Sequence, residues 1–260
     1  MPSLSIATVL YNNTNNDVIK IINNISEVTE NFDKVDLFLI NNSPQNVELE
    51  KFLDSYVESK WIHVLVPLEN NGFGAGNNMV LPYLISDYHL VMNPDIIISD
   101  SKELPKMVEY MEKNPMYGML SPLIKFPNGE VQHLLKRKSS VWDMAIRFIP
   151  IPGTNKRKAW FVNLPDGYSY EHQAENVPGS FMLFRTNIFK QIHGFDENYF
   201  LYMEDCDITM KVNKISKVVF YPNATVYHEW QRENRKSIQG IGHMLSSMIK
   251  YFNKWGWKLW

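Results

Sequence analysis

The stretch from Glu69 to Asn78, ENNGFGAGNN, has glycine at three alternating positions between asparagine pairs. It follows the apolar run Ile62–Val66. A glycine-rich turn after a strand can hold a phosphate, because its backbone N–H groups can approach an anion closely. We therefore interpret this turn as a candidate phosphate site.

Carboxylates stand at two further places where they could do chemistry. Asp95 follows the apolar run Tyr88–Met92, and a carboxylate just past a buried strand can hold a divalent cation against a diphosphate. Glu204, Asp205 and Asp207 crowd together after the aromatic run YFLYM, where a carboxylate could act as a general base beside a sugar. Each has a structural alternative: a solvated turn for Asp95, and a favourable helix dipole for the other three acids.

The first half of the chain alternates strand and helix patterns. Apolar runs predict four strands, at Leu4–Leu10, Val35–Ile40, Ile62–Val66 and Tyr88–Met92. Three predicted helices connect these strands. The first follows a cap at Asn15 or Asn16 and has helical spacing at Val18, Ile21, Ile22, Ile25 and Val28. The second lies around Leu49, Phe52, Leu53 and Tyr56, and the third near Asn77 to Ile85. Strands separated by such helices imply right-handed βαβ units and a mainly parallel sheet.

Ligands bind at the carboxyl ends of the strands in such a sheet. The segments there are YNN (Tyr11–Asn13), NNS (Asn41–Ser43), the glycine turn and NPD (Asn93–Asp95). Asparagine and glycine are good turn formers, but four polar turns at one edge favour a ligand site over turns alone. The first βα turn lacks G-x-G-x-x-G and the chain lacks G-K-[ST], which argues against a Rossmann dehydrogenase and a P-loop NTPase.

The second half of the chain shows a different pattern. From about Met116 it gives antiparallel-looking pieces, YGMLSPLIKF, a basic and aromatic-rich insertion from Lys136 to Tyr170, and the strand VPGSFMLFR. A helix then begins near Glu204, with Ile208, Val212 and Ile215 as its predicted buried face. His228 falls at the end of a further strand, and a lone histidine is more often structural than a ligand.

The C-terminal stretch SIQGIGHMLSSMIKYFNKWGWKLW has an amphipathic pattern. One helical stripe holds Ile238, Ile241, Leu245, Met248, Phe252, Trp255 and Leu259, and Lys250, Lys254 and Lys258 lie opposite. An aromatic, apolar face with a basic back is typical of a helix in a membrane interface, so residues 237–260 are predicted to contact a membrane surface. Packing against the core or against a partner in a homodimer is the alternative.

Bulk properties exclude several classes of protein. The 260 residues are 45% hydrophobic and 21% charged, with a net charge of −2, which is typical of a soluble globular protein and argues against a nucleic-acid partner. A single cysteine excludes an internal disulfide framework. The first residues lack the basic region of a signal peptide, and no apolar run could span a bilayer, so we expect a cytoplasmic protein.

Seven segments, taken in order, resemble the inverting family 2 glycosyltransferases, and their rhamnosyltransferase-like branch in particular: ATVLYNN, LINNS, NNGFGAGNN, MNPD, PGSFMLFR, GFDENYFLYMEDCDI and VYHEW. The resemblance covers about Ser3 to Trp230 and implies an α/β protein with the GT-A fold. That fold has a single Rossmann-like, mainly parallel sheet with helices on both sides and a smaller antiparallel acceptor part. Residues 1–115 would form the donor half, 116–235 the acceptor and catalytic half of the same domain, and 236–260 the amphipathic helix.

The resemblance also implies roles for individual residues. Thr8, Tyr11 and Asn42 would hold the nucleoside, and Asn71, Gly72, Phe73, Gly76 and Asn77 would lie beside the donor diphosphate and sugar. Asn93 and Asp95 stand where the family has its D-x-D motif, with Asn93 replacing the first acid. Asp95 and His228 would bind Mg²⁺ or Mn²⁺. Asp205 matches the general base, and the acceptor would lie against Gly179, Ser180, Tyr202, Glu204 and Asp207.

The implied reaction is transfer of a sugar, with inversion, from a nucleoside diphosphate to a hydroxyl of a cell-surface polysaccharide or lipid-linked glycan. The favoured donor is dTDP-L-rhamnose, with UDP-linked donors still open, and the expected location is the inner face of the cell membrane. No covalent intermediate is needed, so Cys206 is interpreted as a packing residue. Two alternatives remain: a sugar-1-phosphate nucleotidyltransferase, whose basic glycine-rich loop is missing here, and a non-catalytic nucleotide-sugar-binding module, which an intact Asp205 argues against.

Overall fold

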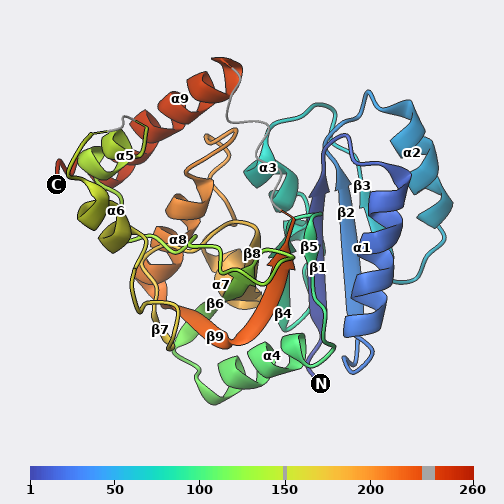
Figure 1. The fold of residues 1–260 in the computed structure, drawn as a ribbon. Coiled ribbons are helices and arrows are strands. Elements are labelled where there is room, and N and C mark those ends of the chain that lie inside the picture. The colour runs from blue at the N-terminus through green and yellow to red at the C-terminus, as the bar shows by residue number, and fades with distance from the viewer. Residues whose placement is uncertain (149–150, 230–237) are drawn as a thin grey trace.

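The structure, a computed structural model, describes residues 1–148, 151–229 and 238–260. Within these residues the strands form one sheet, in the order β3-β2-β1-β4-β8-β6-β9-β5, with β7 beside β9 (Figure 1). The strands are β1 (Leu4–Leu10), β2 (Val35–Asn41), β3 (Ile62–Leu65), β4 (Tyr88–Met92), β5 (Ile96–Ile97), β6 (Tyr117–Lys125), β7 (His172–Gln173), β8 (Phe181–Arg185) and β9 (Lys217–His228).

The sheet is parallel in its first half and mixed in its second. Strands β3, β2, β1 and β4 run parallel to one another, as the βαβ pattern predicts. Strand β8 is antiparallel to β4 and to β6, whereas β6 and β9 are parallel to each other. All seven residues of β1 are buried, because helices cover both faces of the sheet at this point.

The helices divide between the two faces of the sheet. They are α1 (Asn15–Val28), α2 (Val47–Leu53), α3 (Phe73–Asn78), α4 (Glu103–Lys113), α5 (Val141–Phe148), α6 (Asn155–Phe161), α7 (Thr186–Gln191), α8 (Glu204–Ile215) and α9 (Ile238–Trp255), with 3₁₀ turns at Asp54–Tyr56 and Leu81–Tyr83. One core packs α1, α2 and α4 against the sheet, and a second packs α7 and α8 against the opposite face. The sequence prediction of one sheet with helices on both sides is therefore confirmed.

Several local predictions can be compared with the structure. Strands β1 and β4 have the predicted bounds, and the five apolar residues predicted for α1 are its buried face. The cap of α1 is Thr14, not Asn15 or Asn16, because its hydroxyl accepts from the N–H of Asp17 at 3.2 Å and the Asp17 carboxylate accepts from Thr14. The prediction that Ile215 is buried was wrong, since it is 44% exposed at the end of α8.

The helix after the glycine turn begins earlier than predicted. It starts at Phe73, not near Asn77, and ends at Asn78, before the 3₁₀ turn at Leu81–Tyr83. Gly72 precedes it with a φ of 96°, a left-handed conformation that favours glycine. The sequence pattern missed this start because contacts with distant residues, not apolar periodicity, hold the helix in place.

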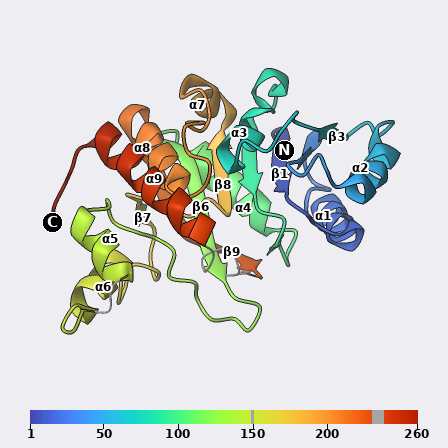
Figure 2. The ribbon, with the colours of Figure 1, turned by 90° about the horizontal axis from the view of Figure 1, so that it is seen from above.

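Helix α9 packs against α8 and the α5–α6 insertion (Figure 2). Of the predicted apolar stripe, Phe252 is buried and Met248 and Trp255 are partly buried in this third core, whereas Ile241 and Leu245 are exposed. The helix therefore has an inner and an outer apolar face. None of the described helices is both long and apolar enough to cross a membrane.

Candidate active site

The glycine turn is held by contacts with two other parts of the chain. Asn42, at the end of β2, donates from Nδ2 to the carbonyl oxygen of Gly72 and to Asn70 Oδ1, both at 3.0 Å. The N–H of Phe73 donates to the carbonyl oxygen of Phe200 at 3.2 Å. A Cβ atom on Gly72 would lie 2.0 Å from the same oxygen, so only glycine fits there. The turn thus joins the carboxyl edge of the sheet to the aromatic run YFLYM, which contains Phe200.

Gly179 lies between the glycine turn and the acidic cluster. A Cβ at Gly179 would lie 3.5 Å from Asp205 Cβ and 3.7 Å from Phe73 Cε1. The N–H of Asn93 donates to the carbonyl oxygen of Ser180 at 2.9 Å, which brings the NPD turn to the same place. The segments predicted to bind the donor, the metal and the acceptor therefore converge at one edge of the sheet.

Asp95 and His228 face each other across the pairing of β5 with β9. The register sets Ile96 opposite His228, and the N–H of Glu229 donates to the carbonyl oxygen of Asp95 at 3.0 Å. His228 Nε2 lies 3.2 Å from Asp95 Oδ1. The two side chains that the sequence proposed as metal ligands are therefore adjacent, although they lie 133 positions apart in the chain (228 − 95).

The hydrogen bonds of His228 indicate which ring nitrogen could bind a metal. Gln132 donates from Nε2 to the His228 carbonyl oxygen at 2.8 Å, which turns its Oε1 toward His228 Nδ1 at 3.1 Å. Because Oε1 can only accept, Nδ1 carries the proton, and the neutral ring then has its lone pair on Nε2, toward Asp95.

The pair fits a small divalent cation. Asp95 Oδ1 is buried, and apart from the approach of His228 Nε2 it has no polar partner among the described residues. Adjacent ligands of an octahedral Mg²⁺ at about 2.1 Å stand about 3 Å apart, close to the observed 3.2 Å. The described residues contain no cluster of three or more acidic, histidine or cysteine side chains that could hold a metal. Any cation bound here would therefore need further ligands from the substrate or water.

The acidic cluster lies at the start of α8, after an unusual turn. Tyr202 and Met203 both have left-handed backbones, with φ values of 68° and 67°, which cost energy for residues other than glycine. This turn directs Glu204 into a buried position and leaves Asp205 partly accessible, with 18% of its side chain exposed. Lys136 Nζ lies 3.4 Å from Asp205 Oδ2.

The two adjacent carboxyl groups have opposite pKa shifts. Burial, reinforced by the neighbouring charge of Asp205, raises the pKa of Glu204. Burial also disfavours the charged form of Asp205, but the Lys136 ammonium and the N–H of Cys206 outweigh it and lower the pKa of Asp205. Asp205 is therefore the accessible member of the pair, in which the charged form is favoured, and Glu204 is the buried member, in which the protonated form is favoured.

Two residues of this site were missed by the sequence analysis. Gln132 orients His228, and Lys136 contacts Asp205, so the segment after β6 reaches both parts of the site. Lys136 was noted only as the start of a basic insertion. Neither residue has a local motif, because each contact depends on a strand or helix about 70 to 100 positions further along the chain.

The remaining predicted residues lie at varying depths. Thr8 is fully buried in β1, and its hydroxyl has no hydrogen-bond partner among the described residues. Tyr11 and Asn71 are exposed beside the carboxyl edge of the sheet. Asn77 is buried and donates from Nδ2 to the carbonyl oxygen of Phe73 at 3.0 Å, so it supports the glycine turn from inside.

Asp207, predicted to contact the acceptor, has a different set of partners. It is fully buried, and its oxygens accept from Lys254 Nζ at 2.8 and 3.0 Å and from Trp255 Nε1 at 2.7 Å. Lys254, predicted to lie on the basic back of the C-terminal helix, also pairs with Asp196 at 2.6 Å. These contacts anchor α9 to α8, and we do not carry the acceptor role of Asp207 forward.

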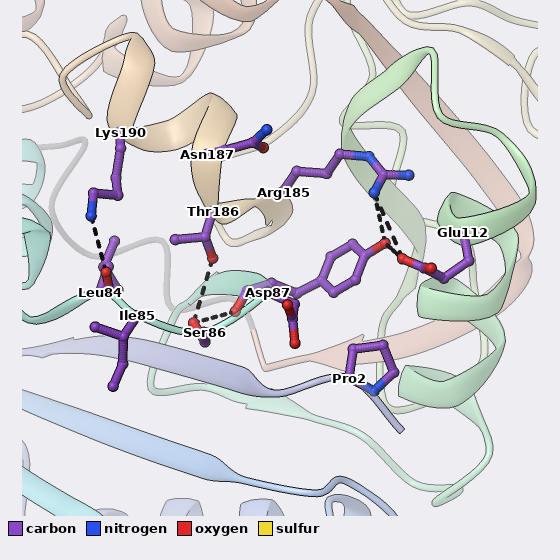
Figure 3. A pocket seen from close by; sticks show the side chains of 11 residues that line it. Pro2, Leu84, Ile85, Ser86, Asp87, Glu112, Arg185, Thr186, Asn187 and Lys190 are labelled. Atoms are coloured by element: carbon purple, nitrogen blue, oxygen red, sulfur yellow. Dashed lines mark hydrogen bonds and ion pairs between the residues drawn. The ribbon is translucent and has the colours of Figure 1, made fainter.

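A hollow of about 670 Å³ lies at the other edge of the sheet, where strands β1 and β4 begin (Figure 3). Its polar side chains are committed to the fold: Arg185 donates to the Tyr88 hydroxyl and to two backbone carbonyl oxygens, and Lys190 donates to the Leu84 carbonyl oxygen. Asp87 accepts from the N–H and hydroxyl of Ser3. This hollow therefore offers a ligand few polar groups, and the candidate site remains the carboxyl edge.

Comparisons with known proteins identify the family of the chain. The sequence profile described as "Glycosyl transferase family 2" matches residues 5–192, which is more than half of the chain. The matched region contains the glycine turn and the NPD turn and ends before Asp205 and His228. The assignments of those two residues therefore depend on the geometry described above.

Two curated relatives are rhamnosyltransferases. The chain is 27% identical over 177 residues to the N-acetylglucosaminyl-diphospho-decaprenol L-rhamnosyltransferase of Mycobacterium tuberculosis, covering 61% of this chain and 56% of that protein. It is 29% identical over 174 residues to rhamnosyltransferase WbbL of Escherichia coli, covering 63% of each. The chain thus spans 56% to 63% of the length of these relatives.

The fold is similar to that of a solved transferase. The structure of mannosyltransferase PcManGT from Pyrobaculum calidifontis, in complex with GDP-Man and Mn²⁺, matches with a TM-score of 0.66. The match covers 97% of this chain and 64% of that one, at 13% sequence identity. At such low identity the likeness shows a shared fold and nothing more.

Proposed function

The chain belongs to the family 2 glycosyltransferases and has the GT-A fold, and we propose that it transfers L-rhamnose from dTDP-L-rhamnose, with inversion, to a hydroxyl of a glycan acceptor. One observation carries the proposal: a Cβ atom added at Gly179 would touch both Asp205 Cβ, at 3.5 Å, and Phe73 Cε1, at 3.7 Å, so the donor turn and Asp205 border the same space beside Gly179. A sugar held by the turn would therefore lie beside a carboxylate able to activate an attacking hydroxyl.

In the proposed reaction Asp205 is the general base. Its charged form is favoured by Lys136 and by the N–H of Cys206, and its side chain is accessible. It would accept the proton of the acceptor hydroxyl as that oxygen attacks the anomeric carbon from the face opposite the leaving diphosphate, which inverts the configuration. Cys206 has no part in this step: burial raises the pKa of its thiol to about 12, and Asn176 donates to its sulfur.

Asp95 and His228 would hold Mg²⁺ or Mn²⁺, which, when bound, neutralises charge on the leaving diphosphate. Gln132 fixes the ring of His228 so that Nε2 faces Asp95. The donor turn would supply backbone N–H groups other than those of Gly72 and Phe73, which already donate within the fold, and Asn42 keeps that turn in place from the end of β2. These residues position the donor, and Asp205 acts on the acceptor.

The choice of rhamnose rests on the two relatives, whose names include this activity. The acceptor is proposed to be a cell-surface polysaccharide or a lipid-linked glycan, in line with the diphospho-decaprenol in the name of the mycobacterial relative. The rest of the chain does not distinguish rhamnose from other hexoses, so UDP-linked and GDP-linked donors belong in the same test.

Contact with a membrane surface is part of the proposal. The outer face of α9 exposes Ile241, Leu245 and Ile249, which are four residues apart and therefore share one face. Beyond the helix, Trp257 and Trp260 are exposed on either side of Lys258, an aromatic and basic combination that suits a lipid interface. The protein would then work on the inner face of the cell membrane, where a lipid-linked acceptor is available.

A thermal-shift screen of nucleotide sugars with Mn²⁺ tests the donor. A ligand at 100 times its Kd stabilises the folded state by about 2.7 kcal/mol. For a chain of this size that corresponds to a rise in Tm of about 5–10 °C. We expect the largest rise for dTDP-L-rhamnose, a smaller one for dTDP, and little for CDP-linked sugars. A clearly larger rise with a UDP-linked or GDP-linked hexose would replace the rhamnose assignment.

The two alternatives predict different products. A sugar-1-phosphate nucleotidyltransferase would release pyrophosphate from dTTP and a sugar 1-phosphate, and we expect none. A non-catalytic binding module would show the thermal shift without any slow hydrolysis of the donor, whereas a transferase lacking its acceptor commonly transfers to water. Loss of that hydrolysis in Asp205→Asn, with donor binding retained, would separate catalysis from binding.

A further inference from the structure

A second cavity is linked to the proposed base through Lys136. It has a volume of about 390 Å³ and is enclosed by the segment after β6 and by helices α5 and α6. Its walls combine apolar side chains, among them Phe126, Ile146 and Phe161, with the cations Lys136, Arg147 and Lys158. Such a lining suits a ligand that is part apolar and part anionic.

The charge of this cavity is positive. Among the described residues that line it, the one carboxylate is Asp143, which is buried and neutralised by Arg157 through bonds to both of its oxygens at 2.6 and 2.8 Å. Ser140 also donates to Asp143 at 2.6 Å. The acid is therefore committed to the fold and does not compensate the cations that face the cavity.

The cations that line the cavity differ from those that lie outside it. Arg137 and Arg157 both stack on Trp160, at 4.8 and 4.0 Å from its ring, and each is near a carboxylate. Arg147 and Lys158 have no carboxylate, hydrogen-bond or ring partner for their charged groups among the described residues. An anion with an apolar part could pair with these two cations and pack its apolar part against the wall of the cavity.

Lys136 belongs to the cavity and to the base at the same time. It lines the cavity, and its ammonium lies 3.4 Å from Asp205 Oδ2 with only 15% of the side chain exposed. A partly buried ammonium has few ways to satisfy its charge, so a second anion near it would compete with Asp205. The cavity is thus connected to the base through one side chain.

We propose that this cavity binds a phosphate-type anion that the acceptor carries next to an apolar chain, held by Arg147 and Lys158, and that this anion competes with Asp205 for Lys136. The inference rests on the proposed function, because it assigns this site to the acceptor of the same reaction. Binding of the charged acceptor would then loosen the Lys136 contact and leave Asp205 a stronger base.

The test uses geranyl phosphate as the probe and measures its Kd by calorimetry, with geraniol and inorganic phosphate as its separate halves. We expect geranyl phosphate to bind at least tenfold more tightly than either half. The double variant Arg147→Gln/Lys158→Gln should weaken it by about 10–100-fold, as expected for charge-assisted hydrogen bonds. The control Lys156→Gln, on the same helix but outside the cavity, should have no effect.

The competition for Lys136 has its own test. Asp205→Asn removes the competing charge, so it should lower the Kd of geranyl phosphate several-fold. This gain in affinity should disappear in a Lys136→Met background. Lys136→Met alone should weaken the probe and Lys136→Arg should restore it. No gain in Asp205→Asn would overturn the competition. Thermal melts of each variant report whether it folds.

Other outcomes would overturn the cavity assignment. An unchanged Kd in the double variant would exclude the cavity as the site. Competition between geranyl phosphate and dTDP would move the probe to the donor site, and tighter binding of a glucuronate-containing disaccharide would replace phosphate by a sugar carboxylate. Since probe binding needs neither donor nor turnover, a failed nucleotide-sugar screen would overturn the proposed function while leaving this result intact.

Discussion

Replacing Asp205 by asparagine, beside Glu204 by glutamine, tests the mechanism most directly. Asparagine keeps the shape of the side chain and an oxygen to accept the N–H of Cys206, which lies 2.8 Å from Asp205 Oδ1. It removes the basic oxygen and, with it, the negative charge that faces Lys136. General-base catalysis contributes about 10²–10⁴ in rate, or about 3–5.5 kcal/mol of activation free energy, and we expect transfer by Asp205→Asn to fall by that factor.

Glu204→Gln is the matched control, because the pKa values of the two acids are shifted in opposite directions. Glu204 is 8% exposed, and burial favours its protonated form, which glutamine mimics in shape and polarity. We therefore expect less than a tenfold change in transfer. The donor Kd should stay within about threefold of the unmodified protein in both variants, since no hydrogen bond or ion pair joins either acid to the donor turn among the described residues.

The stability of Glu204→Gln provides a second measurement with a defined sign. The pKa of Glu204 is raised in the folded state, so the folded protein binds more protons than the unfolded chain between the ordinary carboxyl range, near pH 4.3, and the folded pKa. The free energy of unfolding therefore falls as pH rises through that window. Glutamine removes this loss, so Glu204→Gln should be more stable than the unmodified protein at pH 7, and equal to it at pH 4.

Paired assays decide the outcome: the transfer rate to the acceptor, the donor Kd by calorimetry, and melting curves from pH 4 to 8. Near-normal transfer in Asp205→Asn together with collapse in Glu204→Gln would assign the base to Glu204. Loss of donor binding in Asp205→Asn would place the residue in the donor site. A Glu204→Gln protein that is less stable at pH 7 would show that Glu204 is charged and paired in the folded state.

Three further predictions concern the donor turn, the metal pair and the outer face of α9. Gly72→Ala should lower the free energy of unfolding by at least about 1–3 kcal/mol and abolish donor binding. The reason is that the φ of Gly72 is 96° and the new Cβ would overlap the carbonyl oxygen of Phe200. An unchanged melting curve would contradict this prediction. Asp95→Ala and His228→Ala should each weaken Mn²⁺-dependent donor binding by about tenfold or more, and excess Mn²⁺ should restore part of it. Metal dependence unchanged from the unmodified protein in both variants would exclude the pair. Ile241→Glu/Leu245→Glu should reduce binding to anionic vesicles at least about tenfold without changing the melt, and equal binding would refute membrane contact through this face.

The sequence predicted those parts of the fold that local patterns determine. Apolar runs gave the bounds of β1 and β4, and helical spacing gave the buried face of α1, because each element buries side chains that recur at its own period. The predicted start of α3 was wrong because the true start depends on Phe200, more than 120 positions away. The carbonyl oxygen of Phe200 accepts from the N–H of Phe73 and holds the turn. Likewise, the partners of Asp207 come from α9, and nothing near Asp207 in the sequence indicates them.

The same distinction applies to the candidate site. Positions at strand ends and helix starts could be predicted, since the topology of a parallel sheet brings them to one edge. The electrostatics could not, because the charge state of each acid depends on burial and on Lys136, whose contact with Asp205 spans 69 positions. The sequence analysis chose Asp205 over Glu204 from the resemblance alone, and the structure supplies a physical reason for that choice.

The short segment after β6 contacts both parts of the candidate site. Gln132 orients the ring of His228, a proposed metal ligand, and Lys136, four residues later, contacts Asp205, the proposed base. A shift of this segment would therefore change the metal pair and the base together. Because the same segment forms a wall of the cavity linked to the base, a ligand there can act on both without touching the donor. Substitutions in the cavity should consequently alter the turnover number as well as acceptor affinity, which a separate, passive binding surface would not do.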